Sequence, residues 1–235
     1  MRVVSGLTLA AALAVVAPKI GAQQMQDMAK AVPGGGITVA GWTGKVDANE
    51  EKNGMTVNSA KFAPEKGGFH VTTGPAITYW NPKNMATGNY TVSATFMEPH
   101  YMNLNDHPHP YGIVIAGNDL DNPAAMSLAY CNAYGDGRFI VRGFGPAAFQ
   151  ISPRAAQPNA AINKAAGKDA PVTQEIAMSV SADKISCTIN GTVVASYDKA
   201  TVVTAGKLKS TDGIYGVRFG HNTEAVVTGL SMKKD

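Results

Sequence analysis

The stretch QEIAMSVSADKISCTINGTVVASY, residues 174–197, predicts the fold of this chain. Apolar residues recur at every second position in residues 176–180 and again in residues 185–189. A period of two places each apolar set on one face of a β-strand. Asn190-Gly191 is a strong hairpin signal, because both residues accept positive φ. A third strand follows this turn, so the stretch reads as three consecutive antiparallel strands.

The same pattern recurs upstream. Residues 90–96 alternate between apolar and hydroxyl side chains, as in a half-buried strand. Residues 112–117 are apolar at successive positions, which predicts a central strand that is covered on both faces. Many short strands, frequent turns and almost no helix predict an all-β fold, a two-sheet antiparallel jelly-roll sandwich.

A second hairpin is predicted around Gly135-Asp136-Gly137, with strands at residues 128–134 and 139–144. If Asp136-Gly137 is the turn, one face of this hairpin carries Tyr130, Asn132 and Tyr134 together with Phe139 and Val141. That face is either part of the core with a polar edge or a binding surface.

Two further segments give weaker expectations. Met55–Val57 and Phe69–Val71 are short apolar runs, for which we expect two edge strands. Residues 145–171 form one long loop that is rich in Pro and Ala. Residues 155–168 within it favour a helix of at most two turns, and we expect the loop to be a flap over one face of a sheet.

The N-terminus has the order of residues that is typical of a secretory signal. Arg2 precedes an apolar run over residues 3–17, and small residues follow. We therefore expect a signal peptide over residues 1–22, a flexible lead-in over residues 23–36, and a single β-sandwich domain over residues 37–235. The expected location is secreted or periplasmic. The apolar run is shorter than the ~20 residues of a membrane-spanning helix, so no membrane span is expected in the mature chain.

Charge argues against nucleic-acid binding. Removing Arg2 and Lys19 from the 20 basic side chains leaves 18 against 17 acidic ones. A surface of this near-neutral balance lacks the basic patch that binds a phosphate backbone.

Cys131 and Cys187 are the only cysteines, and both lie in predicted strands. An exported chain favours a disulfide between them. The alternative is a pair of buried free thiols that act as small hydrophobic residues.

The order of these segments resembles the concanavalin A-like lectin and glucanase jelly rolls. The resemblance rests on YGIVIAGND at residues 111–119, AYCNAYGDGRFIVR at 129–142, DGIYGVRFG at 212–220 and VVTGLSM at 226–232. Within that superfamily the pattern is similar to laminin-G-like and 3-keto-disaccharide hydrolase-like domains. The glucanase signature Glu-x-Asp-x-x-Glu is absent from the sequence.

The resemblance implies a carbohydrate- or glycoconjugate-binding module. It also implies a rival reading, in which the chain is a hydrolase of 3-keto-glycosides or related sugars. A structural envelope protein that binds another protein through a sheet face is the third reading.

The densest polar cluster is EPHYMNLNDHPHP, residues 98–110. Imidazole and carboxylate groups are ligands that zinc prefers, although histidines in a stiff, Pro-rich loop are often simply solvated. If a metal binds here, its ligands are expected to be His100, Asp106, His107 and His109. For hydrolysis, the expected acid and base are Glu98 and His107. An Asx-rich turn at residues 118–122 is a second metal candidate, for calcium, or an ordinary turn.

Sugar recognition needs aromatic faces and a few convergent hydrogen-bonding groups. The candidate ligand-binding residues are Trp80, Tyr101, Asn132, Arg142 and His221.

Overall fold

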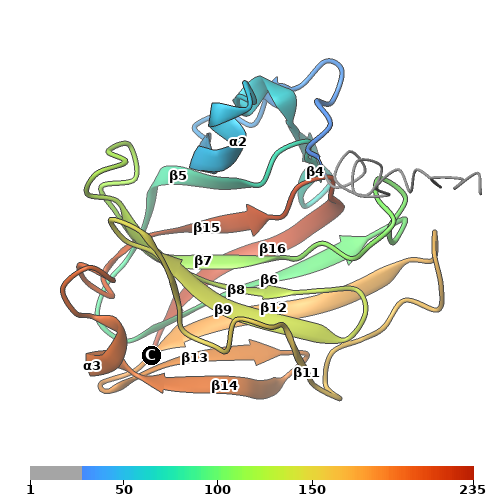
Figure 1. The fold of residues 1–235 in the computed structure, drawn as a ribbon. Coiled ribbons are helices and arrows are strands. Elements are labelled where there is room, and N and C mark those ends of the chain that lie inside the picture. Colours follow the sequence, from blue (N-terminus) through green and yellow to red (C-terminus); the bar gives the residue numbers. More distant parts are fainter. Residues whose placement is uncertain (1–27) are drawn as a thin grey trace, which may run out of the picture.

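The protein is described by a computed structural model, in which residues 28–235 are placed. The predicted signal peptide, residues 1–22, and the start of the predicted lead-in lie outside the described residues. Residues 28–235 form two β-sheets stacked as a sandwich, as Figure 1 shows. The predicted all-β jelly-roll architecture is therefore confirmed. Among these residues, no helix has the length and apolar character needed to cross a bilayer.

Sheet A contains eight strands in the order β1-β3-β4-β16-β6-β12-β13-β14. Neighbouring strands are antiparallel, except that β1 runs parallel to β3. Their bounds are β1 Gly36–Ile37, β3 Lys61–Glu65, β4 Gly68–Thr72, β6 Tyr90–Glu98, β12 Val172–Val180, β13 Lys184–Ile189, β14 Thr192–Asp198 and β16 Glu224–Lys234.

Sheet B runs in the order β10-β9-β8-β7-β15-β5-β2, and β11 also pairs with β9. All of its described pairs are antiparallel. The bounds are β2 Thr43–Val46, β5 Ile77–Ala86, β7 Tyr111–Asn118, β8 Ser127–Ala133, β9 Arg138–Phe144, β10 Ala148–Gln150, β11 Gln157–Pro158 and β15 Gly213–Phe219. Three short helices complete the described chain: α2 Ala48–Lys52, η1 Val57–Ser59 and α3 Lys199–Val202.

The stretch that predicted the fold forms β12, β13 and β14, which are neighbours in sheet A. Ile176, Met178 and Val180 are buried, so the two-residue period does mark the core face. Asn190 and Gly191 have φ values of 50° and 79°. Both are left-handed, as expected for a two-residue hairpin turn of the I′ type.

A disulfide crosses the core from one sheet to the other. Cys131 of β8 is bonded to Cys187 of β13, and their Cα atoms are 6.1 Å apart. Both side chains face the space between the sheets and are buried. This confirms the disulfide reading over that of two free thiols.

Residues 112–117 form the body of β7, and β7 and β8 are the most thoroughly buried strands of sheet B. Ile113 and Ile115 face the core between the sheets, whereas Val114 faces the opposite side and is also buried. The prediction that this strand is covered on both faces is confirmed.

Neither expected edge strand is found: residues 55–57 do not form a strand, and residues 69–71 form a strand that is not at an edge. Residues 57–59 form the helix η1, because the Thr56 hydroxyl accepts from Asn58 N at 3.2 Å and Ser59 Oγ accepts from Thr56 N at 3.1 Å. These local bonds favour a helical turn over a strand. Residues 69–71 do form a strand, β4, but it lies between β3 and β16 and is not an edge.

The long Pro/Ala-rich loop has no helix at residues 155–168. Instead, β10 and β11 pair with β9 and extend the edge of sheet B. Extended pairing satisfies the backbone of a segment in which Pro158 and Gly167 would interrupt a helix.

The register of the second hairpin also differs from the expectation. Tyr130 lies opposite Arg142, and Asn132 lies opposite Ile140. Directly opposed residues share a face, so Phe139 and Val141 lie on the other face, in the core. Tyr134 N donates to the Arg138 carbonyl at 2.8 Å, so the turn consists of residues 135–137, one more than the expected two, and one extra residue reverses the face.

Reduction of the disulfide is expected to lower the free energy of unfolding by about 4 kcal/mol, because Cys131 and Cys187 are 56 positions apart and the bond limits the unfolded chain. Urea unfolding with and without reductant measures this change. The Cys131→Ala/Cys187→Ala double variant is the control and should not respond to reductant. An unchanged midpoint for the reduced native sequence would contradict the expectation.

Candidate functional site

The outer face of sheet B, which points away from sheet A, carries a second apolar layer. Trp80, Val114, Leu128, Tyr130 and Ile140 form a buried cluster there, separate from the core between the sheets. Neighbouring loops supply its cover, with Leu120 and Met126 from the β7–β8 connection and Ala156 from the long loop. Loops cover a sheet less evenly than a third sheet would, and this face is accordingly hollowed.

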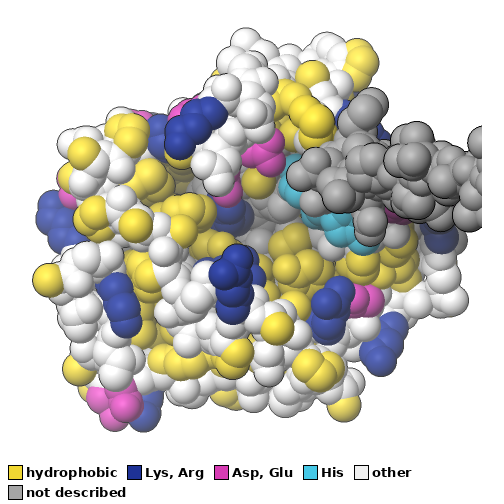
Figure 2. Space-filling view, viewed as in Figure 1, with side chains coloured by type: hydrophobic (Ala, Val, Ile, Leu, Met, Phe, Trp, Pro, Cys, Tyr) yellow, Lys and Arg dark blue, Asp and Glu magenta, His cyan; other side chains and the backbone are white. Residues whose placement is uncertain are grey.

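One hollow on this face is a cleft of about 430 Å³. Trp80, Leu128 and Tyr130 contribute to it from the strands, and residues 145–150 form one wall. The opposite side is lined by Lys45 and by α2 with its preceding Asp47. Figure 2 shows hydrophobic side chains within the depressed part of this face, with lysine and arginine side chains around it.

Arg218 of β15 lies at the base of the cleft. Its guanidinium donates to both Asp47 carboxylate oxygens, at 2.8 and 2.6 Å, and to Thr78 Oγ1 at 2.9 Å. It also stacks over the rings of Tyr130 and Phe144, at 4.8 and 4.7 Å from their centroids. Burial by itself lowers the pKa of Arg218, but Asp47 and Tyr130 together outweigh this, so the pKa lies above its ordinary value.

Arg218 was not among the residues that the sequence singled out. The segment GIYGVRFG contains a pattern that could have indicated Arg218. Val217 and Phe219, on either side of Arg218, face the core. Alternation then places Arg218 on the opposite face. A charged residue in the middle of an apolar strand needs a partner, which is a reason to look for a site there.

The structure brings only part of the predicted ligand-binding set together. Trp80 and Arg142 both line the cleft, but Trp80 is only 3% exposed and belongs to the apolar layer. Arg142 is half-buried and donates to the Arg154 carbonyl at 2.7 Å. Its Nε atom is buried and has no hydrogen-bond partner in residues 28–235.

The other three predicted residues, Tyr101, Asn132 and His221, do not line the cleft. Asn132 is buried beside β15, with its Nδ2 atom 3.5 Å from the Arg218 carbonyl oxygen. Tyr101 is buried against Gly135 at the end of the sandwich.

Glu98, the predicted acid, ends β6 with its side chain buried. Its Oε1 atom accepts from Met102 N at 3.3 Å. Burial raises the pKa of Glu98 to about 7, and the nearby Glu224 and Asp136 carboxylates add to the shift. His107 lies in the loop between β6 and β7, where its ring centroid is 4.4 Å from that of His109.

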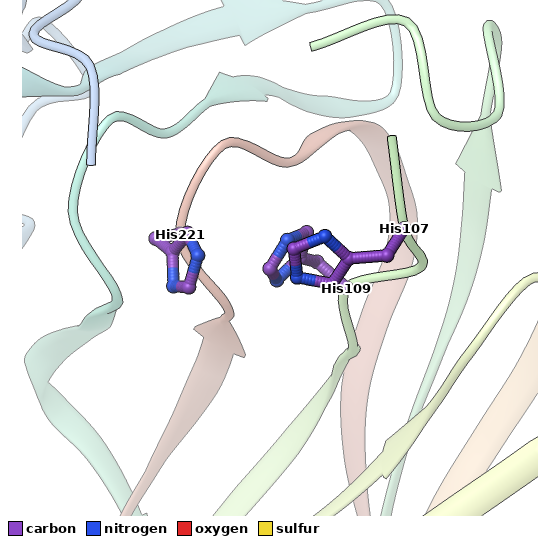
Figure 3. Close-up of side chains that lie close together, drawn as sticks. All are labelled: His107, His109 and His221. Carbon is purple, nitrogen blue, oxygen red and sulfur yellow. The ribbon is translucent and has the colours of Figure 1, made fainter. Parts of the chain in front are cut away.

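A second group of polar side chains lies at the end of β15. His107, His109 and His221 converge so that their candidate ligand nitrogens all lie within 4.8 Å of one another (Figure 3). Two residues of the predicted metal set, His107 and His109, are therefore brought together. The other two are not in this group: Asp106 contacts His107 Nδ1 at 3.1 Å, and His100 is exposed elsewhere in the loop.

The Asx-rich turn at residues 118–122 uses its side chains within the protein. Asn118 Nδ2 donates to the Ala116 and Asp212 carbonyls, Asp119 pairs with Lys209 at 2.8 Å, and Asn122 Oδ1 accepts from Ala124 N. These bonds are typical of a structural turn. In the described chain, Asp119 and Asp121 do not belong to a converging group of three His, Cys, Asp or Glu side chains.

Arg218→Met is expected to lower the free energy of unfolding by about 3 kcal/mol, because it leaves the partly buried Asp47 carboxylate without its partner. Adding Asp47→Asn removes the orphaned charge and should restore part of that loss. Urea unfolding of the wild type, both single variants and the double variant measures the coupling between the two residues. Strictly additive effects would contradict the structural importance of the pair.

Glu98→Gln is expected to change how stability depends on pH. The folded protein holds the Glu98 proton up to about pH 7, whereas the ordinary pKa is 4.5. Stability from this group is therefore complete below pH 4.5 and is lost as the pH rises to about 7. The Gln variant lacks this loss. As the pH rises from 4.5 to 8, its free energy of unfolding should therefore increase by up to about 3 kcal/mol relative to that of the wild type. Parallel stability curves for the two proteins, from urea unfolding, would contradict the raised pKa.

No protein-family model matches the chain, and the comparison with curated proteins finds no match. Solved structures do match. The carbohydrate binding module CBM66 from Bacillus subtilis aligns with a TM-score of 0.53 at 11% identity, over 85% of this chain and 99% of that one. A protein of unknown function with a galectin-like fold, also from Bacillus subtilis, aligns with a TM-score of 0.52 at 12% identity, over 82% and 89% of the two chains.

Identities this low show similarity of fold and carry no residue of one protein over to another. The aligned shares of the chains include most of the two stacked sheets described above. The chain shares the two-sheet jelly-roll fold with these two structures.

Proposed function

We propose that this protein binds carbohydrate in the cleft on the outer face of sheet B. The observation that carries the proposal is the pairing, in one cleft, of two half-buried aromatic rings with an unsatisfied donor. The rings are those of Phe144 and Phe149, and the donor is the buried Nε atom of Arg142. Sugars present apolar CH faces and hydroxyl groups together, and a cleft of this composition matches both.

The two rings are held in place by their surroundings. Phe149 lies directly on Gly143, where a Cβ atom would come within 2.3 Å of the ring. Only a residue without a side chain allows the ring to lie this close to β9. Phe144 is fixed from the other side by the Arg218 guanidinium and by Tyr130, whose ring centroid is 5.9 Å away. Rings that are already ordered lose little entropy when a ligand binds.

Polar side chains surround these rings. Asn49 and Gln150 are exposed residues that line the cleft, and Lys45 lines it on the side of β2. The amides can both donate to and accept from sugar hydroxyls, and the Lys45 ammonium group can donate to them. The similarity in fold to CBM66, which is described as a carbohydrate binding module, supports the same class of ligand.

The carboxylates of the cleft favour binding over hydrolysis. Glycoside hydrolysis ordinarily uses two carboxyl groups that act on opposite sides of one bond. Asp47 is held by two bonds from Arg218, and Glu51 lies 3.9 Å from the Lys45 ammonium group. Carboxylates engaged in this way are poorly suited to transfer protons. The hydrolase reading is for this reason the weaker proposal.

We also propose that the protein is exported, to the periplasm or out of the cell. The N-terminal order of residues supports this location. The disulfide adds independent support, since such bonds persist in oxidising compartments and are rare in the cytosol.

Phe149→Ala and Arg142→Ala are each expected to weaken sugar binding about tenfold, because a lost ring face or charged donor is worth on the order of 1.4 kcal/mol. The measurement is a screen of the purified chain on immobilised glycans, followed by calorimetry of each variant with the glycan that binds. Arg138→Ala is the matched control, since Arg138 lies on the same strand but pairs with Asp136 outside the cleft.

Two outcomes would contradict the proposal. One is that no glycan binds the wild-type protein. The other is that the cleft variants bind as well as the Arg138→Ala control. Thermal melting of each variant confirms that it is folded before its affinity is compared.

A further inference from the structure

We propose that His107, His109 and His221 form a binding site for a transition-metal ion of the zinc class. The site is separate from the carbohydrate cleft, and its existence does not depend on carbohydrate binding. The first observation is convergence, because the candidate ligand nitrogens of the three imidazoles lie within 4.8 Å of one another.

The backbone brings these residues together from distant parts of the sequence. β7 and β15 pair side by side, with Tyr111 opposite Phe219. The segment that enters β7 and the segment that leaves β15 therefore lie next to each other, and Gly220 N donates to the Pro110 carbonyl at 2.7 Å. His109 and His221 extend from these two segments, and their ring centroids are 4.1 Å apart.

His107 completes the group from the same loop as His109. Pro108 separates the two histidines and stiffens the segment between them. The His107 ring centroid lies 4.4 Å from that of His109 and 6.4 Å from that of His221. Figure 3 shows the three rings approaching one another from the two segments.

A second observation supports a ligand role: each imidazole also has a polar neighbour. Asp106 Oδ1 lies 3.1 Å from His107 Nδ1, and Glu50 Oε1 lies 3.8 Å from His221 Nδ1. Asn105 Nδ2 lies 2.6 Å from His109 Nε2. The two carboxylates can accept an imidazole N–H, which orients a metal-binding ring and increases its basicity, whereas the Asn105 amide nitrogen is a donor. The two carboxylates also make the site favourable for a cation.

The chemistry of the ligands selects the class of metal. Imidazole nitrogen suits zinc, copper and nickel, whereas calcium takes oxygen ligands. Zinc binds imidazole nitrogen at about 2.0–2.1 Å, which places the ligand atoms of a tetrahedral site about 3.4 Å apart. The separation of up to 4.8 Å must shorten by about 1.4 Å on binding. Small side-chain rotations of His107, whose side chain is 43% exposed, and of its neighbours can supply this change.

Three protein ligands define an open site. A structural zinc site is usually closed by four protein ligands, whereas a site with three keeps a position for water or another small ligand. The side chains of His107 and His221 are 43% and 22% exposed, so solvent has access to the position between them.

The test uses the purified chain prepared without a polyhistidine tag and freed of metal with a chelator. Titration with Co²⁺ should give binding of one ion per chain with the visible absorption of a low-coordinate nitrogen site, and Zn²⁺ should displace it. His107→Ala, His109→Ala and His221→Ala should each weaken Zn²⁺ binding by about 100-fold or more. Asp106→Asn and Glu50→Gln should weaken it about tenfold, the size expected for groups that orient a ligand.

The chain supplies its own controls, because it has five histidines and two lie outside the group. His100 is exposed, and His70 pairs with Glu224 at 2.9 Å. His100→Ala and His70→Ala should leave the affinity unchanged. Thermal melting in the presence of chelator identifies any variant that has lost its fold, and for such a position the conservative change to Gln is used instead.

The proposal is overturned if the wild-type protein fails to bind one Co²⁺ or Zn²⁺ per chain. It is also overturned if the controls outside the group weaken binding as much as the changes at the three proposed ligands.

Discussion

The central strands of sheet B are buried on both faces, so other parts of the molecule must pack against each of the two faces. Sheet A covers one face through a continuous apolar core. The other face carries Trp80, Leu128 and Tyr130 and is covered in part by loops, while the short helix α2 lines the cleft beside them. Loops leave gaps where a sheet would not, so the need to bury this second apolar layer also produces the cleft.

One ion pair fixes the geometry of that cover. Arg218 stands in the apolar layer, where a guanidinium without a partner would be costly. Asp47 meets it with two hydrogen bonds, which positions the start of α2 over the sheet. The same helix carries Glu50 toward His221. A single buried charge thus links the wall of the cleft to the histidine group at the end of β15. Pairs of this kind contribute more to a specific geometry than to net stability.

The sequence predicted the fold well where the determining signals are local. Alternation marked β6, β12 and β13, and Asn190-Gly191 marked the turn before β14. It indicated less about which residues meet in the cleft of the proposed function. Arg142 lines that cleft, but Arg218 was not singled out, and Tyr101 and Asn132 lie elsewhere. Strand order and register decide which residues converge on a site. Neither can be derived from the spacing of residues within one segment.

The sequence by itself determined the β-strands, the sandwich class and the pair of cysteines available for a bond, because alternation, turn residues and composition act over a few neighbouring positions. Only the tertiary structure decided which residues meet. One extra residue in the turn at 135–137 placed Tyr130 opposite Arg142 and Phe139 in the core. The pairing of β7 with β15 brought His221 to His107 and His109, a contact between distant segments that depends on sheet topology.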